Sequence, residues 1–513
     1  MLGKVIMVQG TASHVGKSVL VSALCRMFRQ EGFKVAPFKA QNMSNNSFVT
    51  LDGGEIGRAQ AVQAEACGID ATVQMNPVLL KPEADHRSQV VVLGKPLLTA
   101  EARDYYDLKP TLWESITQSI DELRRLFDIV VIEGAGSPAE INLKKNEIVN
   151  MSVAKYCQAP VLLCGDIDRG GVFASLVGTL EILEPEERDL IKGFIINKFR
   201  GDISLLTDGL DWLENKTQKK VVGVVHHYRD IHIPEEDSVA LDLPSHKTQE
   251  EHITVNVIQL PHISNFDDFD PLLRDPLVNL QFSTTADSLS ATDLIIIPGS
   301  KSTISDLQWL EKTGISDKIT QLHQANNIPI IGICGGYQML GKQLLDPNLV
   351  ESQLPEYSGL GLLNHTTTFA STKSTHRITG KVASNHGLLK HATNSQISGY
   401  EIHMGASIHE SSSPFILETR KDVPDFTPCP DGVESNDGIV FGTYIHGLFH
   451  NTAIRQSIVK FISESKGIIV TNDDYEYSMD NEYNKLADWV RNSLDMNFLY
   501  RITGLETQIN FRD

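Results

Sequence analysis

Short apolar segments alternate with amphipathic ones along roughly the first 230 residues of the chain. Helical periodicity at 16–32 and 112–127 predicts amphipathic helices between buried strands. Continuously apolar strands separated by helices indicate a parallel sheet covered on both faces, with ligands at the carboxyl ends of the strands. The predicted strands lie at 4–10, 34–39, 127–136, 159–167, 192–199 and 220–225.

A polar stretch without apolar periodicity, residues 235–252, interrupts this pattern and predicts a linker. A second series of apolar segments follows it and predicts a second α/β domain with a strand-rich later part. From about residue 453 the chain is polar and aromatic, which predicts a helical tail. The predicted strands of the second series lie at 253–261, 293–300, 328–336, 377–383, 398–405 and 438–449. The predicted boundaries are a first domain at 1–235, a linker at 236–252, a second domain at 253–450 and a tail at 451–513.

Length and composition support this division. A chain of 513 residues is too long for one hydrophobic core, and 41% hydrophobic with 21% charged residues is ordinary for a globular protein. The formal net charge of −20 argues against a general nucleic-acid or anionic-membrane binder, which would carry a basic face. No segment approaches the length of a transmembrane helix, and the N-terminus is typical of a first strand rather than a signal peptide.

The cysteines are scattered and form no CxxC pair, so we expect neither a disulfide framework nor a zinc site. A reducing cytoplasm is the expected location. The six residues are Cys25, Cys67, Cys157, Cys164, Cys334 and Cys429.

Residues 10–18, GTASHVGKS, lie between a predicted strand and a predicted helix, the setting of a phosphate-binding loop. Its glycines would let backbone N–H groups and the helix N-terminus face phosphate. Five residues separate the two glycines, one more than the common spacing, so this is a variant loop. A glycine-rich helix start with a solvated lysine is the alternative. The predicted ATP-binding residues of the loop are Gly10, Thr11, Gly16, Lys17 and Ser18.

Polar side chains end three further predicted strands, where they would meet the loop. Glu133 follows an apolar strand, and we expect it to hold Mg²⁺ together with Ser18. Lys39 is predicted to touch phosphate. The other polar residues could bind a polar acceptor or simply form surface turns. These candidate acceptor residues are Asn42, Asn45, Asn46, Asp166, Asp168 and Arg169.

Cys334 stands between an apolar strand and a Gly-Gly pair that opens a helical segment, GICGGYQML. This order is typical of a nucleophile elbow, in which a sharp turn exposes the side chain and a helix N-terminus favours the thiolate. A buried core cysteine is the alternative. His446 follows an apolar strand 112 residues later and is the predicted base. The N–H groups of Gly335 and Gly299 are the predicted oxyanion donors.

The second domain, over about residues 252–450, resembles the class I, triad-type glutamine amidotransferases. The resemblance implies that the cysteine attacks the glutamine side-chain amide and releases ammonia. That class usually carries a glutamate two residues after the histidine, where this chain has Leu448. A Cys–His dyad, or a base oriented by another group, is therefore expected.

The first domain resembles the dethiobiotin synthetase family, which shares the long loop spacing and uses ATP to activate a carboxylate. Together the halves resemble the cobyric acid synthase family, on seven distinctive stretches. The resemblance implies ATP- and glutamine-dependent amidation of the b, d, e and g carboxylates of an adenosylated corrinoid a,c-diamide. The matching stretches are KAQNMSNNSFVT, DIDRGGVF, PHISNFDDFDPL, PGSKST, GICGGYQMLG, GYEIHMG and GTYIHGLF.

Three other functions remain open from the sequence. One is the related amidase of the a and c side chains, and another is a CTP synthase-like enzyme with a nucleotide acceptor. The third is a partition-type ATPase that binds a partner and carries an inactive amidotransferase domain. A chain that both uses ATP and releases ammonia is more consistent with an amide ligase. Phosphorylation by ATP activates a carboxylate for attack, and ammonia released inside the protein stays unprotonated and can attack it.

Overall fold

The computed structural model describes residues 2–84, 87–228, 231–234, 252–468 and 478–506. They form two compact units, the first from 1–44, 55–236 and 478–513 and the second from 45–54 and 237–477. This division differs from the predicted one in three places: 45–54 packs in the second unit, 451–468 of the predicted tail also belongs to the second unit, and 478–506 of that tail belongs to the first. Apart from His252, the predicted linker lies outside the described residues. Within the described ranges, no helix is long and apolar enough to cross a membrane.

The first unit is built on a parallel six-stranded sheet, in the order β12-β11-β10-β1-β9-β2. Its central strands are buried, as their continuous apolar sequences require. Val8 pairs with Glu133 and Gly10 with Cys164, so the strand ends lie at one edge. The strands are β1 (Lys4–Gly10), β2 (Val35–Phe38), β9 (Ile129–Glu133), β10 (Val161–Asp166), β11 (Ile191–Phe199) and β12 (Lys220–His226).

A smaller sheet of this unit has the order β3-β6-β7-β8. Its strands are β3 (Gln41–Met43), β6 (Val78–Ala84), β7 (Arg87–Val92) and β8 (Lys95–Glu101). The helices of eight or more residues before the linker are α1 (Lys17–Gln30), α2 (Arg58–Cys67), α3 (Ala102–Leu126), α5 (Val172–Ile182) and α7 (Thr207–Thr217). Two shorter helices are α4 (Met151–Cys157) and α6 (Pro185–Leu190).

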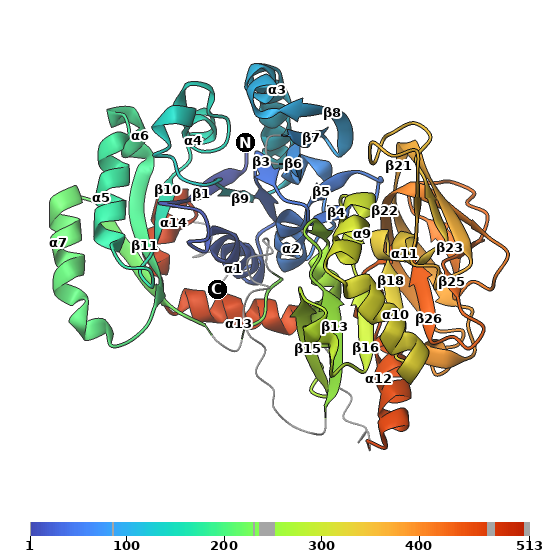
Figure 1. Ribbon diagram of the computed structural model, residues 1–513. Helices are drawn as coiled ribbons and strands as arrows, with labels where there is room; N and C mark the ends of the chain where they lie inside the picture. Colours follow the sequence, from blue (N-terminus) through green and yellow to red (C-terminus); the bar gives the residue numbers. More distant parts are fainter. Residues whose placement is uncertain (1, 85–86, 229–230, 235–251, 469–477, 507–513) are drawn as a thin grey trace. The chain divides into compact units, whose positions relative to one another are not determined.

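The C-terminal segment forms α13 (Met479–Arg491) and α14 (Met496–Thr503). Apolar side chains of both helices join the core around α1, and α13 lies beside α1 in Figure 1. Arg26 of α1 pairs with Asp480 of α13 at 3.0 Å. The segment is helical, as predicted, and it completes the core of the first unit.

The second unit contains a sheet in the order β15-β13-β16-β18-β26-β25, parallel except for the edge strand β25. Its strands are β13 (Ile253–Ile258), β15 (Val278–Ser283), β16 (Leu294–Ile297), β18 (Ile330–Ile333), β25 (Val433–Glu434) and β26 (Val440–Thr443). The helices of this unit are α8 (Asp270–Leu273), α9 (Thr303–Lys312), α10 (Ile315–Asn326), α11 (Gly335–Leu340) and α12 (Thr452–Lys466).

A second sheet of this unit runs β20-β19-β21-β22-β27, with β23 beside β21 and β24 beside β23. Its strands are β19 (Gln343–Leu345), β20 (Glu356–Ser358), β21 (His365–Val382), β22 (Gln396–His409), β23 (Phe415–Arg420), β24 (Cys429–Asp431) and β27 (Ile445–His446). A two-stranded sheet joins β14 (Ile263–Ser264) to β17 (Gly299–Ser300). The predicted fold class, two α/β domains, is confirmed, because each unit pairs parallel strands with helices.

Candidate active site

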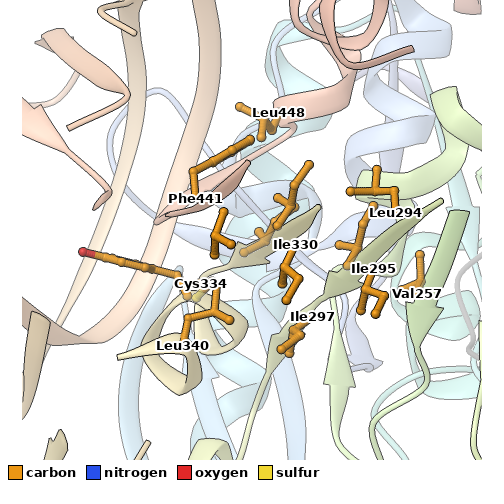
Figure 2. Close-up of a cluster of buried hydrophobic side chains, with 14 of the residues drawn as sticks. Val257, Leu294, Ile295, Ile297, Ile330, Cys334, Leu340, Phe441 and Leu448 are labelled. Atoms are coloured by element: carbon orange, nitrogen blue, oxygen red, sulfur yellow. The ribbon is translucent and has the colours of Figure 1, made fainter. Parts of the chain in front are cut away.

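Cys334 occupies the sharp turn between strand β18 and helix α11. Its φ of 52° and ψ of −106° lie in a region that side chains avoid, so the surrounding structure must hold this backbone in place. Glycine is required beside it, because a Cβ on Gly336 would lie 2.0 Å from the carbonyl oxygen of Ile297. Figure 2 shows Cys334 at the end of the strand that carries Ile330, next to Leu340. The turn has the geometry of a nucleophile elbow.

His446 lies at the end of β27 and is fully buried. Its Nδ1 is 2.7 Å from Oδ2 of Asp268, and the other oxygen of that carboxylate accepts the Gly447 N–H at 2.7 Å. The carboxylate therefore holds the proton of the neutral ring on Nδ1, and Nε2 points into the protein interior, away from Asp268. Nε2 is buried and makes no hydrogen bond with any described residue. It is thus open to take a proton from a nucleophile.

The charge environment favours protonation of His446. Burial lowers its pKa, but the Asp268 carboxylate and, after it, the neighbouring Cys334 outweigh burial and raise the pKa to about 10. The Cys334 thiol, 7% exposed, donates to the carbonyl oxygen of Ile402 at 3.4 Å. A thiolate–imidazolium pair is the arrangement that activates a cysteine nucleophile.

Asp268 is the group that orients His446, the predicted base, and the sequence did not point to it. Leu448, at the position of the usual glutamate, is fully buried in the hydrophobic cluster of Figure 2. Asp268 lies 178 residues before His446, in the stretch PHISNFDDFDPL. The signal was present, since two adjacent aspartates sit between phenylalanines and are buried. Only the fold shows which of them faces the histidine.

The predicted oxyanion donors lie around this pair. A Cβ on Gly299 would lie 3.1 Å from Cε1 of His446, and one on Gly335 would lie 2.9 Å from the amide nitrogen of Ser300. The structure therefore brings both glycines to the turn that carries Cys334. Their role as donors stays a prediction.

The phosphate loop lies between β1 and α1, the arrangement that the sequence predicts. Gly16 has a φ of 97°, and Lys17 begins the helix. The ammonium group of Lys17 donates to the carbonyl oxygen of Ala12 in the loop, at 2.9 Å, and to that of Gly136 after β9, at 3.1 Å. The amide of Thr11 donates to a neighbouring strand, so this N–H is used by the fold.

Glu133 is the centre of a buried polar cluster beside this loop. Its carboxylate accepts the Ser18 hydroxyl at 2.9 Å and pairs with the Lys39 ammonium at 2.9 Å. Gln63 of α2 donates to the second oxygen, a contact that sequence reasoning did not anticipate. Burial of an ionised carboxylate requires such partners. Within the described ranges, no three His, Cys, Asp or Glu side chains form a metal-binding group.

This donor set fits magnesium. Mg²⁺ prefers oxygen ligands and is commonly held by one or two carboxylates, with water and substrate phosphates completing its shell. Glu133 and Ser18 supply a carboxylate and a hydroxyl that are already 2.9 Å apart. The Lys39 ammonium group pairs with the same Glu133 carboxylate, so its positive charge lies close to the residues that would bind magnesium and phosphate.

The candidate acceptor residues are divided between the two units. Asn42 belongs to the first unit and bonds Gln60 at 3.1 Å, whereas Asn45 and Asn46 belong to the second unit. Arg169 is exposed. Two further candidates are engaged in ion pairs: Asp166 with Lys198 at 3.0 Å and Asp168 with Arg200 at 2.8 Å.

Comparison with known proteins assigns both halves of the chain. Residues 6–239 match the CobQ/CobB/MinD/ParA nucleotide binding domain, and residues 254–454 match the CobB/CobQ-like glutamine amidotransferase domain. A cobyric acid synthase of Dehalococcoides mccartyi is 52% identical over 98% of this chain and 99% of its own. One from Desulforamulus reducens is 50% identical over the same shares. A glutamine amidotransferase structure from Thermotoga maritima aligns with 49% of this chain and 98% of its own, at 14% identity and a TM-score of 0.28. The chain belongs to the cobyric acid synthase family, with a nucleotide-binding domain followed by a glutamine amidotransferase domain.

Proposed function

We propose that the chain catalyses the ATP- and glutamine-dependent amidation of the b, d, e and g carboxylates of adenosylcobyrinic acid a,c-diamide. The observation that carries this proposal is the occurrence of two separate chemical centres in one chain. One is the hydrogen-bonded pair His446–Asp268 beside Cys334. The other is the phosphate loop with Glu133 bound to Ser18. Full-length similarity to cobyric acid synthases supports the choice of acceptor.

In the glutaminase half, the Cys334 proton passes to Nε2 of His446 and the thiolate attacks the amide carbon of glutamine. The N–H groups of Gly299 and Gly335 would stabilise the oxygen of the tetrahedral intermediate. Ammonia leaves with the proton that His446 returns, and a thioester remains on Cys334. Water, deprotonated by the same imidazole, releases glutamate. Asp268 keeps the ring oriented throughout.

In the synthetase half, an acceptor carboxylate would attack the terminal phosphorus of ATP, and ADP leaves. Ammonia then attacks the acyl phosphate, and inorganic phosphate leaves as the amide forms. Lys17 is the residue best placed to neutralise charge on the phosphates, and Ser18 and Glu133 would hold magnesium. When bound, magnesium supplies further neutralisation of phosphate charge.

The test is to assay the wild-type protein and Cys334→Ser with the corrinoid diamide and Mg-ATP, using glutamine or ammonium chloride. We expect the variant to lose amidation with glutamine and to keep it with high ammonium, with products counted by mass spectrometry. Cys429→Ser is the matched control, because this half-buried cysteine lies in β24 of the same unit. Loss with both nitrogen sources would mean that Cys334 supports the fold. Activity of the wild-type protein only on a nucleotide or on the a and c carboxylates would refute the acceptor assignment.

A further inference from the structure

Residues 45–54 leave the first unit and pack in the second, although the chain on both sides of them belongs to the first. Within this segment, β4 (Ser47–Val49) lies against β21 and β22 of the second unit. Phe48 and Val49 form a small apolar cluster there with Tyr400 and Ile402, separate from the main core. The segment is therefore fixed to the sheet that pairs with the histidine strand.

Tyr400 of this apolar cluster is in direct contact with His446. Tyr400 is 4% exposed, and its ring stacks on the imidazole of His446, with centroids 5.3 Å apart and planes 17° apart. Phe48 meets the same tyrosine ring edge-on, at 5.4 Å and 60°. The Arg377 guanidinium lies 4.8 Å from the Phe48 ring centroid. Stacking limits the plane of the imidazole, and the Asp268 hydrogen bond limits its rotation, so both together set the direction of Nε2.

The same short strand, β4, also contacts the residue before the turn that carries Asp268, the hydrogen-bond partner of His446. The Ser47 amide donates to Oδ1 of Asn265 at 3.1 Å. Asn265 has a φ of 53° and precedes the turn 266–269, which carries Asp268. Movement of residues 47–48 would thus act on the stacking partner of His446 and on the turn of its carboxylate. Asn45 and Asn46, two of the candidate acceptor residues, come immediately before this strand.

We propose that Phe48 and Tyr400 are positioning residues for His446, through which the segment 45–54 makes glutamine hydrolysis depend on the bound acceptor. The inference rests on the proposed function and adds its regulation. An acceptor that contacts Asn45 or Asn46 stabilises the seating of Phe48 on Tyr400, and the imidazole then faces Cys334. The segment 45–54 would exchange between a state with Phe48 packed on Tyr400 and one without that contact. An acceptor shifts this equilibrium only by its higher affinity for the packed state. Weakening the contact between Phe48 and Tyr400 should therefore abolish the stimulation of glutamine hydrolysis by the acceptor. Ammonia is then released when a carboxylate is present to receive it.

The experiment measures glutaminase with and without corrinoid diamide and Mg-ATP, in Phe48→Ala, Tyr400→Leu and Tyr400→Phe. Leu51→Ala is the matched control, since Leu51 lies in the same segment and is 42% exposed. We expect Phe48→Ala and Tyr400→Leu to lose about ten- to a hundredfold of the acceptor-stimulated kcat, with the KM for glutamine changed by less than about threefold. Tyr400→Phe, which keeps the ring, and Leu51→Ala should remain within about threefold of the wild type. Ammonium-dependent amidation should persist in all of them.

A second measurement separates positioning from simple support of the fold. The pH profile of iodoacetamide alkylation, followed on the Cys334 peptide, should change in Tyr400→Leu and not in Leu51→Ala, because thiolate formation depends on the imidazole. An unchanged profile, or full acceptor stimulation in Phe48→Ala, overturns the inference. Loss of ammonium-dependent amidation in Phe48→Ala also overturns it, since the segment would then serve the synthetase reaction itself. A wild-type protein that amidates no corrinoid with either nitrogen source overturns the proposed function, a result distinct from these.

Discussion

Replacing Asp268 with asparagine removes the charge that supports His446 and changes little in shape. Burial opposes the imidazolium, and the Asp268 carboxylate is the largest of the influences that raise the pKa of His446 to about 10. The difference from 6.5 corresponds to about 5 kcal/mol in favour of the charged ring, at about 1.4 kcal/mol per pKa unit. Without the carboxylate, burial should dominate and the pKa should fall, so the thiolate–imidazolium pair should give way to the neutral pair.

An asparagine also allows the wrong ring nitrogen to carry the proton. The equivalent change in a serine protease triad lowers kcat about 10⁴-fold, and we expect a loss of about 10² to 10⁴ in glutaminase kcat here. Residual activity should increase with pH, because the attack on glutamine needs a thiolate and alkaline solution favours thiolates in general. Ammonium-dependent amidation should stay near the wild-type rate, since it needs neither Cys334 nor His446.

The assay is glutamate release over a range of pH, with ammonium-dependent amidation measured in parallel. Glu464→Gln is a suitable control, because it removes a carboxylate beside a histidine, His391 at 3.2 Å, on the exposed surface of the same unit. Glutaminase of Asp268→Asn within about threefold of the wild type would refute the reasoning, as it would show that the hydrogen bond is not needed to orient the base.

Three further changes test other parts of the structure. Lys17→Ala should abolish acceptor-dependent ATP hydrolysis and leave a basal glutaminase; near wild-type amidation would contradict the phosphate-loop assignment. Glu133→Gln should raise the magnesium concentration needed for half-maximal amidation and lower turnover, whereas an identical magnesium titration would remove its role as a ligand. Asp431→Asn should flatten the pH dependence of stability: burial and Glu401 raise the pKa of Asp431 from 3.8 to about 7, so the wild type loses up to about 4 kcal/mol as pH rises through this range. Thermal melts of both proteins between about pH 5 and 8 measure this, and parallel curves would contradict it.

The proposed glutaminase centre combines residues that are far apart in the chain. Asp268, Cys334 and His446 come from a helical turn, an elbow and a strand end. The base is held from two sides, by the Asp268 carboxylate at Nδ1 and by the Tyr400 ring on its face. Leu448 stands where the usual triad has a glutamate, and in this fold the Asp268 carboxylate takes the position beside the histidine instead.

The sequence determined the features that depend on local order. Strands buried on both faces must be continuously apolar, so the segments at 4–10 and 328–336 predict β1 and β18. A phosphate loop needs glycines and a lysine between a strand and a helix, and an elbow needs small residues beside the nucleophile. Lys17 and Cys334 were therefore predictable with their surroundings.

Tertiary structure alone decided the contacts between distant segments. No periodicity relates Asp268 to a histidine 178 residues away, because which of several aspartates faces the base depends on how the strands meet. Gln63 reaches Glu133 only because α2 packs near β9. The seating of residues 45–54 in the second unit is likewise invisible in the sequence, since a short polar and aromatic segment is compatible with either unit. Phe48 of this segment contacts Tyr400 of the distant strand β22, a contact between residues far apart in the chain that holds the segment to the second unit.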